Sequence, residues 1–312
     1  MKDILVLDIG GTSIKYALMD RDFNMMTHGR HPITNTTIED LLDFIAEVAR
    51  LHEGRFEAVS VSMPGRIDME KGIAHSGGVF EFMIEKPFAA MISDRLGVPV
   101  FIANDANCAG EAELKLGALR GVSSGAVLVA GSSIGGALIV DGKVRMGHNF
   151  AAGEAAWLPV DLTNVYNVEY TCANRAEGMS GSVASAMGLL NTYAIKKGEE
   201  PPYSAKAGKE FLAAYDAGEP EAVEAMKEHA MNFAAVIFSI QAFLDLERFA
   251  IGGGMTAHPV YVSSIREAVD RLYAKYPNAA VRKPEVVCCE YGADANLIGA
   301  LAFYLDSKKL KK

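Results

Sequence analysis

The chain has 312 residues and half of them are apolar, so it is long enough for two domains with sizeable cores. Its formal net charge of −9 argues against a nucleic-acid-binding surface, which needs clustered lysine and arginine. No signal peptide or membrane-spanning run is visible, because the N-terminal "MKDILVLDIGG" turns glycine-rich before an apolar segment develops. We therefore expect a cytoplasmic protein whose four cysteines are reduced thiols.

The first predicted elements are two strands joined by a glycine corner, in "LVLDIGGTSIKY" at residues 5–16. Glycine lets the backbone approach a phosphate, and a carboxylate beside such a loop suits Mg²⁺. Asp8, Gly10, Gly11 and Thr12 are therefore candidates for a phosphate and magnesium site. The alternative is an ordinary tight hairpin in which Asp8 caps the turn.

Strands and helices then alternate. A helix is predicted over 36–51, with a capping box of Thr36 and Glu39, followed by a strand that ends at Pro64–Gly65. A short helix is expected up to Gly97, and then a strand, a polar corner and another helix over 98–119. This alternation favours an α/β layered fold.

The polar corner "NDAN" at residues 104–107 is the sharpest catalytic candidate. Asn104 and Asp105 follow a buried strand and precede a helix, which is where α/β folds place ligands. Asp105 can act as a general base that takes a proton from a hydroxyl attacking a phosphate. The alternative is a helix N-cap, since Asp and Asn cap helices well.

The opening design restarts near residue 126, where "AVLVAGSSIGGALIVDG" again reads strand, glycine corner, strand. The corner from Gly131 to Gly136 can hold a polyphosphate together with the first corner, and Gly252–Gly254 can lie near a nucleotide base or ribose. For this third corner, close packing of a strand on a helix remains an alternative. Residues 180–246 are expected to be mainly helical, and the last predicted helix contains "ADANLIGALAFYL".

Three further polar residues lie near predicted loops. Glu154, in "AAGEAAW", can accept hydrogen bonds from sugar hydroxyls, although a solvated loop carboxylate is the alternative. His75 and His148 have no companions in the sequence, and we interpret both as structural or surface residues.

These motifs, taken in order, resemble the ROK family of sugar kinases, which belongs to the actin, Hsp70 and hexokinase ATPase superfamily. The resemblance rests on Asp8–Thr12, Pro64–Gly65, Asn104–Asn107, Gly131–Gly136, Ala152–Glu154 and Ile251–Gly254, and it covers nearly the whole chain.

The resemblance implies an α/β fold of two ribonuclease-H-like domains with ATP and sugar in a central cleft. The expected domains are 1–117, on which a C-terminal helix at 293–312 packs back, and 118–292. It also implies a homodimer that uses ATP and Mg²⁺, with Asp8 meeting the metal through water.

The resemblance also implies roles for individual residues. Asp105 would be the catalytic base, and Gly65, Asn104, Asp105 and Glu154 would contact the sugar. Trp157, which departs from the family pattern, is a further candidate for a sugar contact. The residues that would hold ATP are Asp8, Gly10, Gly11, Thr12, Gly131, Ser132, Ser133, Gly135, Gly253 and Gly254.

The chain departs from the family at its zinc site. Most members carry a histidine three residues after the glutamate and a downstream cysteine cluster, whereas here those places hold Trp157 and only Cys172. One thiolate cannot form a four-coordinate zinc site, so we expect no structural zinc. A zinc-free branch that resembles β-glucoside kinases shares these features. Trp157 then either stacks on a sugar or aglycone or fills the volume that the zinc motif left. Ser133 also replaces a usual glycine.

The expected function is an ATP-dependent kinase for the 6-hydroxyl of glucose or of a β-glucoside, with N-acetylmannosamine and fructose as alternative acceptors. A sugar-responsive transcriptional regulator of the same family is a weaker alternative, because regulators carry a helix-turn-helix before the first strand. A non-catalytic nucleotide-binding module is a third alternative, which the "NDAN" corner disfavours. The expected partner is a small sugar, without nucleic acid or membrane.

Overall fold

A computed structural model describes residues 2–11, 13–33, 37–78, 80–167, 177–201, 207–278 and 280–309. By its internal contacts the chain divides into two units. Unit 1 comprises Met1–Leu116, Val144–Ala152 and Asp294–Lys312, and unit 2 comprises Gly117–Lys143 and Gly153–Ala293. Three separate stretches of sequence therefore build unit 1.

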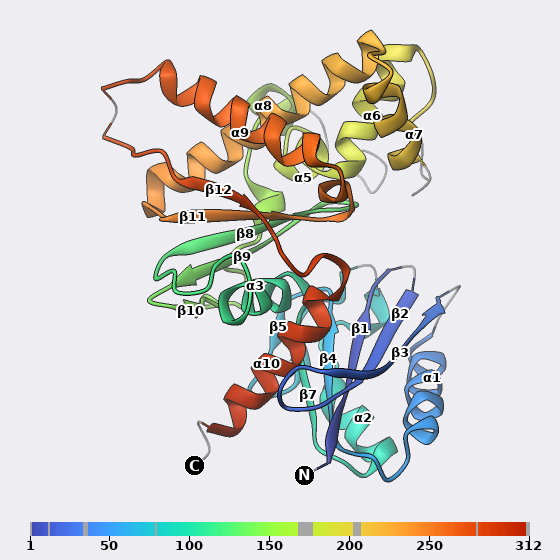
Figure 1. Cartoon of the computed structure of the whole chain (residues 1–312). Coiled ribbons are helices and arrows are strands. Elements are labelled where there is room, and N and C mark those ends of the chain that lie inside the picture. Colours follow the sequence, from blue (N-terminus) through green and yellow to red (C-terminus); the bar gives the residue numbers. More distant parts are fainter. Residues whose placement is uncertain are drawn as a thin grey trace. The chain divides into compact units, whose positions relative to one another are not determined.

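The sheet of unit 1 has five strands in the order β3-β2-β1-β4-β7 (Figure 1). The strands are β1 (Asp3–Ile9), β2 (Ser13–Met19), β3 (Met25–Pro32), β4 (Phe56–Met63) and β7 (Val100–Asn104). β1, β2 and β3 are antiparallel neighbours, whereas β4 is parallel to both β1 and β7. The predicted corner between the first two strands is confirmed. A small hairpin of β5 (Ile67–Asp68) and β6 (Ile73–Ala74) follows β4.

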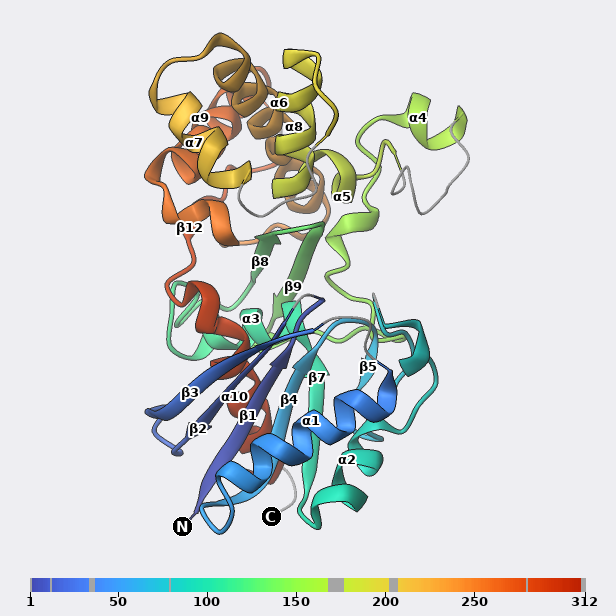
Figure 2. The ribbon, with the colours of Figure 1, turned by 90° about the vertical axis from the view of Figure 1, so that its right-hand side faces the viewer.

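Helices cover both faces of this sheet. α1 (Ile38–Leu51) and α2 (Phe88–Leu96) lie on one face, and α3 (Asp105–Lys115) and α10 (Ala295–Lys309) lie on the other (Figures 1 and 2). Because side chains alternate along a strand, Leu5 and Leu7 join the core beneath α1 and α2. The capping box of α1 is formed by Thr37 and Asp40, one residue later than the pair predicted from the sequence.

The other face of the sheet meets α10 closely. The Ser60 hydroxyl on β4 donates to the Ala300 carbonyl at 2.7 Å, and both residues are buried. A Cβ atom on Gly299 would lie 1.8 Å from the Cys108 carbonyl oxygen, so α10 and α3 touch backbone to backbone. Helix α10 therefore depends on glycine at this contact.

The sheet of unit 2 repeats this arrangement, with the order β10-β9-β8-β11-β12. Its strands are β8 (Gly125–Ala130), β9 (Ile134–Val140), β10 (Lys143–Val144), β11 (Arg248–Gly252) and β12 (Glu285–Cys288). β8 and β9 are antiparallel, and β11 is parallel to β8 and β12. The repeat predicted near residue 126 is thus confirmed at the level of topology.

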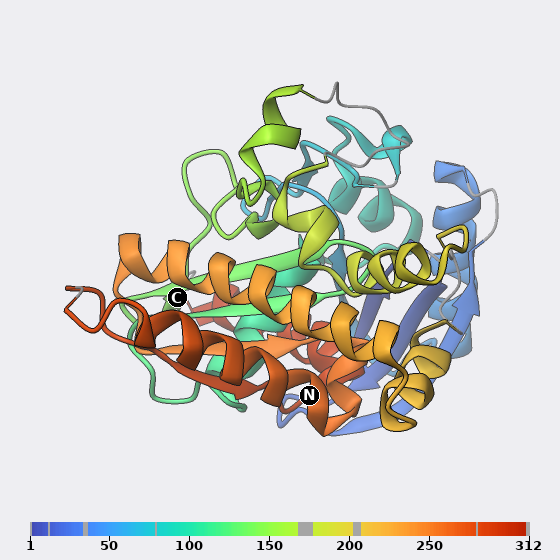
Figure 3. The ribbon, with the colours of Figure 1, turned by 90° about the horizontal axis from the view of Figure 1, so that it is seen from above.

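The α-helices of unit 2 lie partly within residues 180–246, which were predicted to be mainly helical, and partly outside them. The α-helices are α4 (Leu162–Asn167), α5 (Ser180–Val183), α6 (Ala186–Lys197), α7 (Ala207–Asp216), α8 (Pro220–Leu244) and α9 (Pro259–Ala274). Short 3₁₀ turns lie at η1 (Glu81–Met83) in unit 1, at η2 (Ala155–Trp157) and η3 (Gly254–Ala257) in unit 2, and at η4 (Gly292–Asp294). Figure 3 shows α8 and α9, in orange, side by side. Both contribute buried side chains to one core with β8 and β11.

The α/β fold class predicted from alternating elements is confirmed, with mixed strands in both sheets. Within the residues that the structure describes, no helix is both long and apolar enough to cross a membrane.

Candidate active site

Three neighbouring strands of unit 1 carry a polar residue at, or one position before, their C-terminal ends, which lie at the same end of the sheet. In the parallel register, Asp8 of β1 lies opposite Ser62 of β4, and Met63 of β4 lies opposite Asn104 of β7. The carboxyl ends of parallel strands are where α/β sheets bind ligands. The strand register alone therefore brings Asp8 and the "NDAN" corner to the same end of the sheet.

Asp8 is held from three sides. Its Oδ1 accepts hydrogen bonds from the Ser62 hydroxyl and from the Asn296 side-chain amide, each at 3.0 Å. Its Oδ2 lies 3.1 Å from the ammonium of Lys15, its partner across the antiparallel β1–β2 ladder. Asp8 is only 5% exposed. Its three donors keep the carboxylate in one orientation.

These contacts allow a test of whether Asp8 suits Mg²⁺. A carboxylate has about four lone-pair directions, and the three donors use three of them. Mg²⁺ sheds its waters reluctantly and usually keeps several of them. The donor set fits a hydrated magnesium ion that meets Asp8 through a water molecule.

Asn104 and Asp105 form the turn from β7 into α3. Asn104 is the N-cap of α3, since its Oδ1 accepts from the Asn107 amide at 2.9 Å. Its side-chain amide donates to the Gly65 carbonyl at 2.9 Å and to Asp105 Oδ1 at 3.1 Å. The Ala106 amide also donates to Asp105 Oδ1, at 2.8 Å. Asn104 thus caps the helix and joins the Pro-Gly corner to the Asp105 carboxylate.

The pKa of the buried Cys108 thiol depends on the charges of this site. Burial raises the pKa of Cys108 well above its usual value, and the carboxylates of Asp8 and Asp105 raise it further. The Ser62 side chain lowers this pKa in part through a hydrogen bond. The charges of Asp8 and Asp105 thus act on one thiol in the first turn of α3.

The glycines of unit 1 make close approaches possible. Gly65 has φ +103°, and a Cβ there would lie 1.9 Å from the Ser76 carbonyl oxygen. The Gly10 amide donates to the Ser13 carbonyl at 3.0 Å, which closes the first corner, and Gly11 is exposed. Thr12, the fourth predicted residue of this corner, lies outside the described residues.

In unit 2 the second corner joins β8 to β9. The Gly131 amide donates to the Ser133 carbonyl at 2.8 Å, and Gly131, Ser132 and Ser133 are all exposed, whereas Gly135 is half-buried. The third corner follows β11, which is parallel to β8. Gly253 has φ +113°, and a Cβ there would lie 2.0 Å from the Ala130 carbonyl oxygen.

The two corners of unit 2 therefore lie side by side at the ends of β8 and β11. The last residue of the third corner is Gly254, where an added Cβ would meet no other atom within 4 Å.

Glu154 is the N-cap of the 3₁₀ turn η2, and Trp157 is the last residue of that turn. The bend before Glu154 is made by Gly153 at φ +89°, whose backbone packs against Gly136 of β9 so closely that a Cβ on Gly136 would lie 2.3 Å from the Gly153 oxygen. Glu154 is exposed, and Trp157 is 58% exposed. Both side chains lie on the same unit as the second and third corners.

Candidate metal ligands do not cluster among the described residues. No group of three or more histidine, cysteine, aspartate or glutamate side chains that could hold a metal ion is found there. Cys172, the remaining cysteine of the expected zinc segment, lies outside that part of the chain.

Sequence reasoning missed several partners. Lys15, Ser62 and Asn296 were not singled out, although Lys15 can be paired with Asp8 by counting across a hairpin. His75 was interpreted as having no companions, but it contacts Glu85 and stacks on Phe150. These contacts arise between loops, for which the sequence carries no periodic signal.

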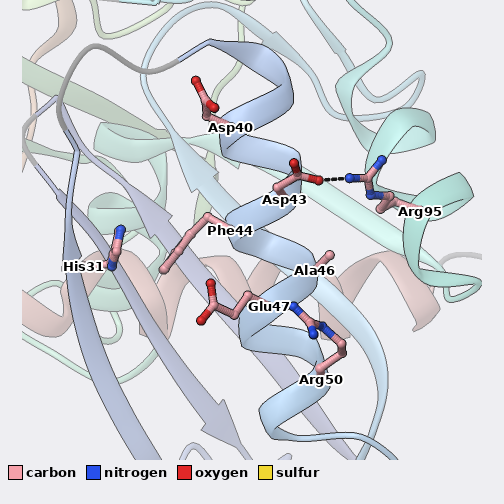
Figure 4. A pocket seen from close by; sticks show the side chains of 8 residues that line it. All are labelled: His31, Asp40, Asp43, Phe44, Ala46, Glu47, Arg50 and Arg95. Carbon is pink, nitrogen blue, oxygen red and sulfur yellow. Dashed lines mark ion pairs between the residues drawn. The ribbon is translucent and has the colours of Figure 1, made fainter.

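A separate open depression lies on unit 1 away from these residues. It has a volume of about 590 Å³, and α1 lines most of it, with His31 of β3 and Arg95 of α2 (Figure 4). Asp43 and Arg95 form an ion pair across it. None of the predicted site residues lines this depression.

The fold and the strand-end residues define the class of protein. Two α/β units with the same five-strand order, each carrying a glycine corner in its first hairpin, have the actin-type ATPase fold.

The profile of the ROK family matches residues 4–307, and the chain belongs to this family. It is 30% identical over 273 residues to an uncharacterized protein of Clostridium perfringens, covering 84% of this chain and 86% of that one. It is 26% identical to a β-glucoside kinase of Klebsiella pneumoniae, covering 96% and 94%. A ROK family protein of Streptococcus pneumoniae, solved in complex with sucrose, superposes with a TM-score of 0.82 at 27% identity over 99% of both chains.

Proposed function

We propose that this protein is an ATP-dependent sugar kinase that phosphorylates the 6-hydroxyl of glucose or of a β-glucoside. The observation that carries the proposal is the Asn104–Asp105 turn, which is fixed to Gly65 and lies at the same sheet edge as Asp8. Membership of the ROK family and the similarity to a β-glucoside kinase support it.

The chemical step assigned to unit 1 is proton removal during phosphoryl transfer. The sugar oxygen attacks the γ-phosphorus and forms a new O–P bond, while the bond from that phosphorus to the bridging oxygen breaks and ADP leaves with the electron pair. Asp105 takes the hydroxyl proton, and the two donors on its Oδ1 hold the carboxylate in one direction. Such general-base help is worth about 10²–10⁴-fold in rate.

Other residues bind and orient in this proposal. Gly65 and Asn104 are proposed sugar contacts, and so are Glu154 and Trp157, which offer a carboxylate and an exposed ring. The glycine corners at Gly10–Gly11 and Gly131–Ser133, with Ser132 and Gly135, bind phosphates through backbone N–H groups. Gly253 and Gly254 approach the adenosine.

Asp8 binds hydrated Mg²⁺ in this proposal, and when bound the ion neutralises charge on the phosphates. We expect no structural zinc, which elemental analysis of the purified protein can check. One equivalent of bound zinc would contradict the interpretation of Trp157 as a replacement for a zinc ligand.

The proposal is tested with Asp105→Asn, which keeps the size of the side chain and removes the base. The assay uses the sugar that the wild type phosphorylates fastest. We expect kcat for ADP release with this sugar to fall by about 10²–10⁴-fold, with a smaller change in KM. Asp161→Asn is the matched control, because Asp161 also accepts backbone hydrogen bonds at the start of a helix. Near-normal turnover of Asp105→Asn would refute the assignment of the base.

A further inference from the structure

A chain of contacts runs from the Asp105 turn along the Pro-Gly corner of unit 1. The Asn104 amide donates to the Gly65 carbonyl at 2.9 Å. Gly65 in turn packs against the Ser76 carbonyl, which would lie 1.9 Å from a Cβ on that glycine. The His75 amide donates to the Arg66 carbonyl at 2.9 Å. The backbone of His75 is therefore fixed to the corner that faces the proposed base.

Further contacts lead from His75 back to the Asp105 turn through residues 144–152, which also belong to unit 1. The His75 ring stacks on Phe150, with 5.7 Å between ring centroids and 17° between planes. The Ala152 amide donates to the Met146 carbonyl at 3.1 Å. The Asn107 side-chain amide then meets the Met146 sulfur at 3.5 Å. Asn107 lies in the first turn of α3, so the contacts form a closed ring that includes the Asn104–Asp105 turn.

Two residues in this closed set of contacts have a strained backbone. Phe150 has φ +57° and Glu85 has φ +56°, a left-handed conformation that costs energy for residues other than glycine. Both of these residues contact His75, whose Nδ1 lies 2.9 and 3.1 Å from the two carboxylate oxygens of Glu85. Strain held at two residues around one histidine is typical of functional sites.

We propose that His75, Glu85 and Phe150, which we call the His75 cluster, form a subsite for a second ring of the acceptor. This inference rests on the proposed function and names its substrate class: a glycoside that carries a sugar or aryl ring beyond the pyranose that is phosphorylated. The aromatic faces suit the apolar face of a ring, and the Glu85 carboxylate suits hydroxyl donors.

The exposure and position of the cluster support this use. The side chain of His75 is 26% exposed and that of Glu85 is 63% exposed, so both are reachable. Within the ring of contacts, His75 and Phe150 are separated from Asp105 by several contacts in either direction. The cluster therefore belongs to the same network of contacts as the proposed base.

A purely structural role makes a different prediction. If the cluster only fastened residues 144–152 to the neighbouring hairpin, its loss would loosen the loop and weaken every acceptor alike. A subsite, by contrast, affects only acceptors long enough to reach it. The ratio between a one-ring and a two-ring acceptor separates the two cases.

Phe150→Gly is the sharpest variant, because glycine adopts a positive φ without strain while the ring is lost. We expect kcat/KM for cellobiose to fall by at least about tenfold, as for the loss of a ring contact, with less than about a twofold change for glucose. Phe23→Gly is the matched control, since Phe23 also has φ +66° and lies in unit 1 between β2 and β3. The control should leave both values unchanged. Equal losses for both sugars in Phe150→Gly would overturn the subsite.

A second variant and a binding measurement keep the inference independent of turnover. Glu85→Gln should weaken cellobiose binding, measured by calorimetry, and leave glucose binding unchanged. If the wild type releases no ADP with any sugar, the proposed function fails, but tighter binding of cellobiose than of glucose that disappears in Phe150→Gly still supports the subsite. If the wild type binds cellobiose no better than glucose, or if it phosphorylates single-ring sugars only, the subsite is wrong.

Discussion

At Cys108, burial and two carboxylates act in the same direction. Burial is the larger cause of the raised pKa of this thiol, and Asp8 and Asp105 add to it, because each disfavours a thiolate nearby. The thiolate is the reactive form of cysteine. Cys108 should therefore be chemically inert although it lies beside the proposed catalytic residues.

We expect native Cys108 to resist alkylation by iodoacetamide at pH 8, whereas Cys288 and Cys289, which are partly exposed, react first. Mass spectrometry of the labelled peptides measures each site separately. In denaturant all of these thiols should react at similar rates, which provides the internal control. Rapid labelling of Cys108 in the folded protein would mean that the first turn of α3 opens easily.

The sequence predicted the residues of the candidate site more readily than it predicted their partners. Asp8, Asn104 and Asp105 were predicted because a polar residue after an apolar strand marks the edge of a sheet. The partners of Asp8 are harder to find. Asn296 is 288 positions away along the chain, and no local pattern links it to the first strand. Its place follows from the packing of α10, which is a property of the tertiary fold.

Between the elements α8 and α9, a buried histidine makes stability depend on pH. His229 lies 2.8 Å from the Tyr261 hydroxyl, and burial lowers the pKa of His229 to about 4. Between about pH 6.5 and pH 4 the unfolded chain binds a proton that the native protein does not. The free energy of unfolding should therefore fall as the pH is lowered through this window, by on the order of 3 kcal/mol in full.

This dependence is measured by urea unfolding of the wild type and of His229→Gln at several values from pH 7 to pH 4.5. We expect a flatter dependence in the variant, because glutamine does not titrate. His52→Gln is the comparison, since burial also lowers the pKa of His52, assisted by Arg55. Unchanged pH dependence in His229→Gln would show that the pKa of His229 is the same in the native and unfolded states.

Helices α3 and α10 meet at a point that only glycine allows. A Cβ on Gly299 would lie 1.8 Å from the Cys108 carbonyl oxygen, which is backbone and cannot move alone. We expect Gly299→Ala to lower the free energy of unfolding by about 1–3 kcal/mol through overpacking. Gly208→Ala in α7 is the control, since its Cβ would meet only the flexible Met255 side chain, at 3.3 Å. Urea unfolding compares the two, and equal stabilities would mean that α10 can shift along α3.

The elements themselves were largely predictable, and the reasons are physical. Strand, glycine corner and strand recur at residues 5–16 and 126–142, and both became antiparallel pairs. Helix α2 ends at Gly97, at φ +68°, as its glycine signal indicated. The capping box of α1 was one residue off, because Thr36 and Thr37 are equally good caps and only the tertiary fold chooses between them.

The two sheets have the same strand order, but different stretches of sequence complete the two units. Unit 2 takes its sheet from residues 125–144 and 248–288, whereas unit 1 is completed by the C-terminal stretch from residue 294. Helix α10 brings three kinds of contact to unit 1: the Asn296 amide on Asp8, the Ala300 carbonyl on Ser60, and Gly299 on α3. We propose that α10 folds as part of the N-terminal domain predicted from the sequence.

Removing α10 tests this assignment. A chain that ends after Ala293 leaves the Ser60 hydroxyl without its partner and exposes the buried face of α3, so unit 1 should lose stability locally. We expect hydrogen exchange followed by mass spectrometry to show lost protection in β1, β4 and α3, while β8, β9 and β11 keep theirs. A chain that ends after Lys309 is the control and should match the full chain. Equal loss of protection in both sheets would instead mean that the molecule unfolds as one cooperative body, and that α10 belongs to neither unit alone.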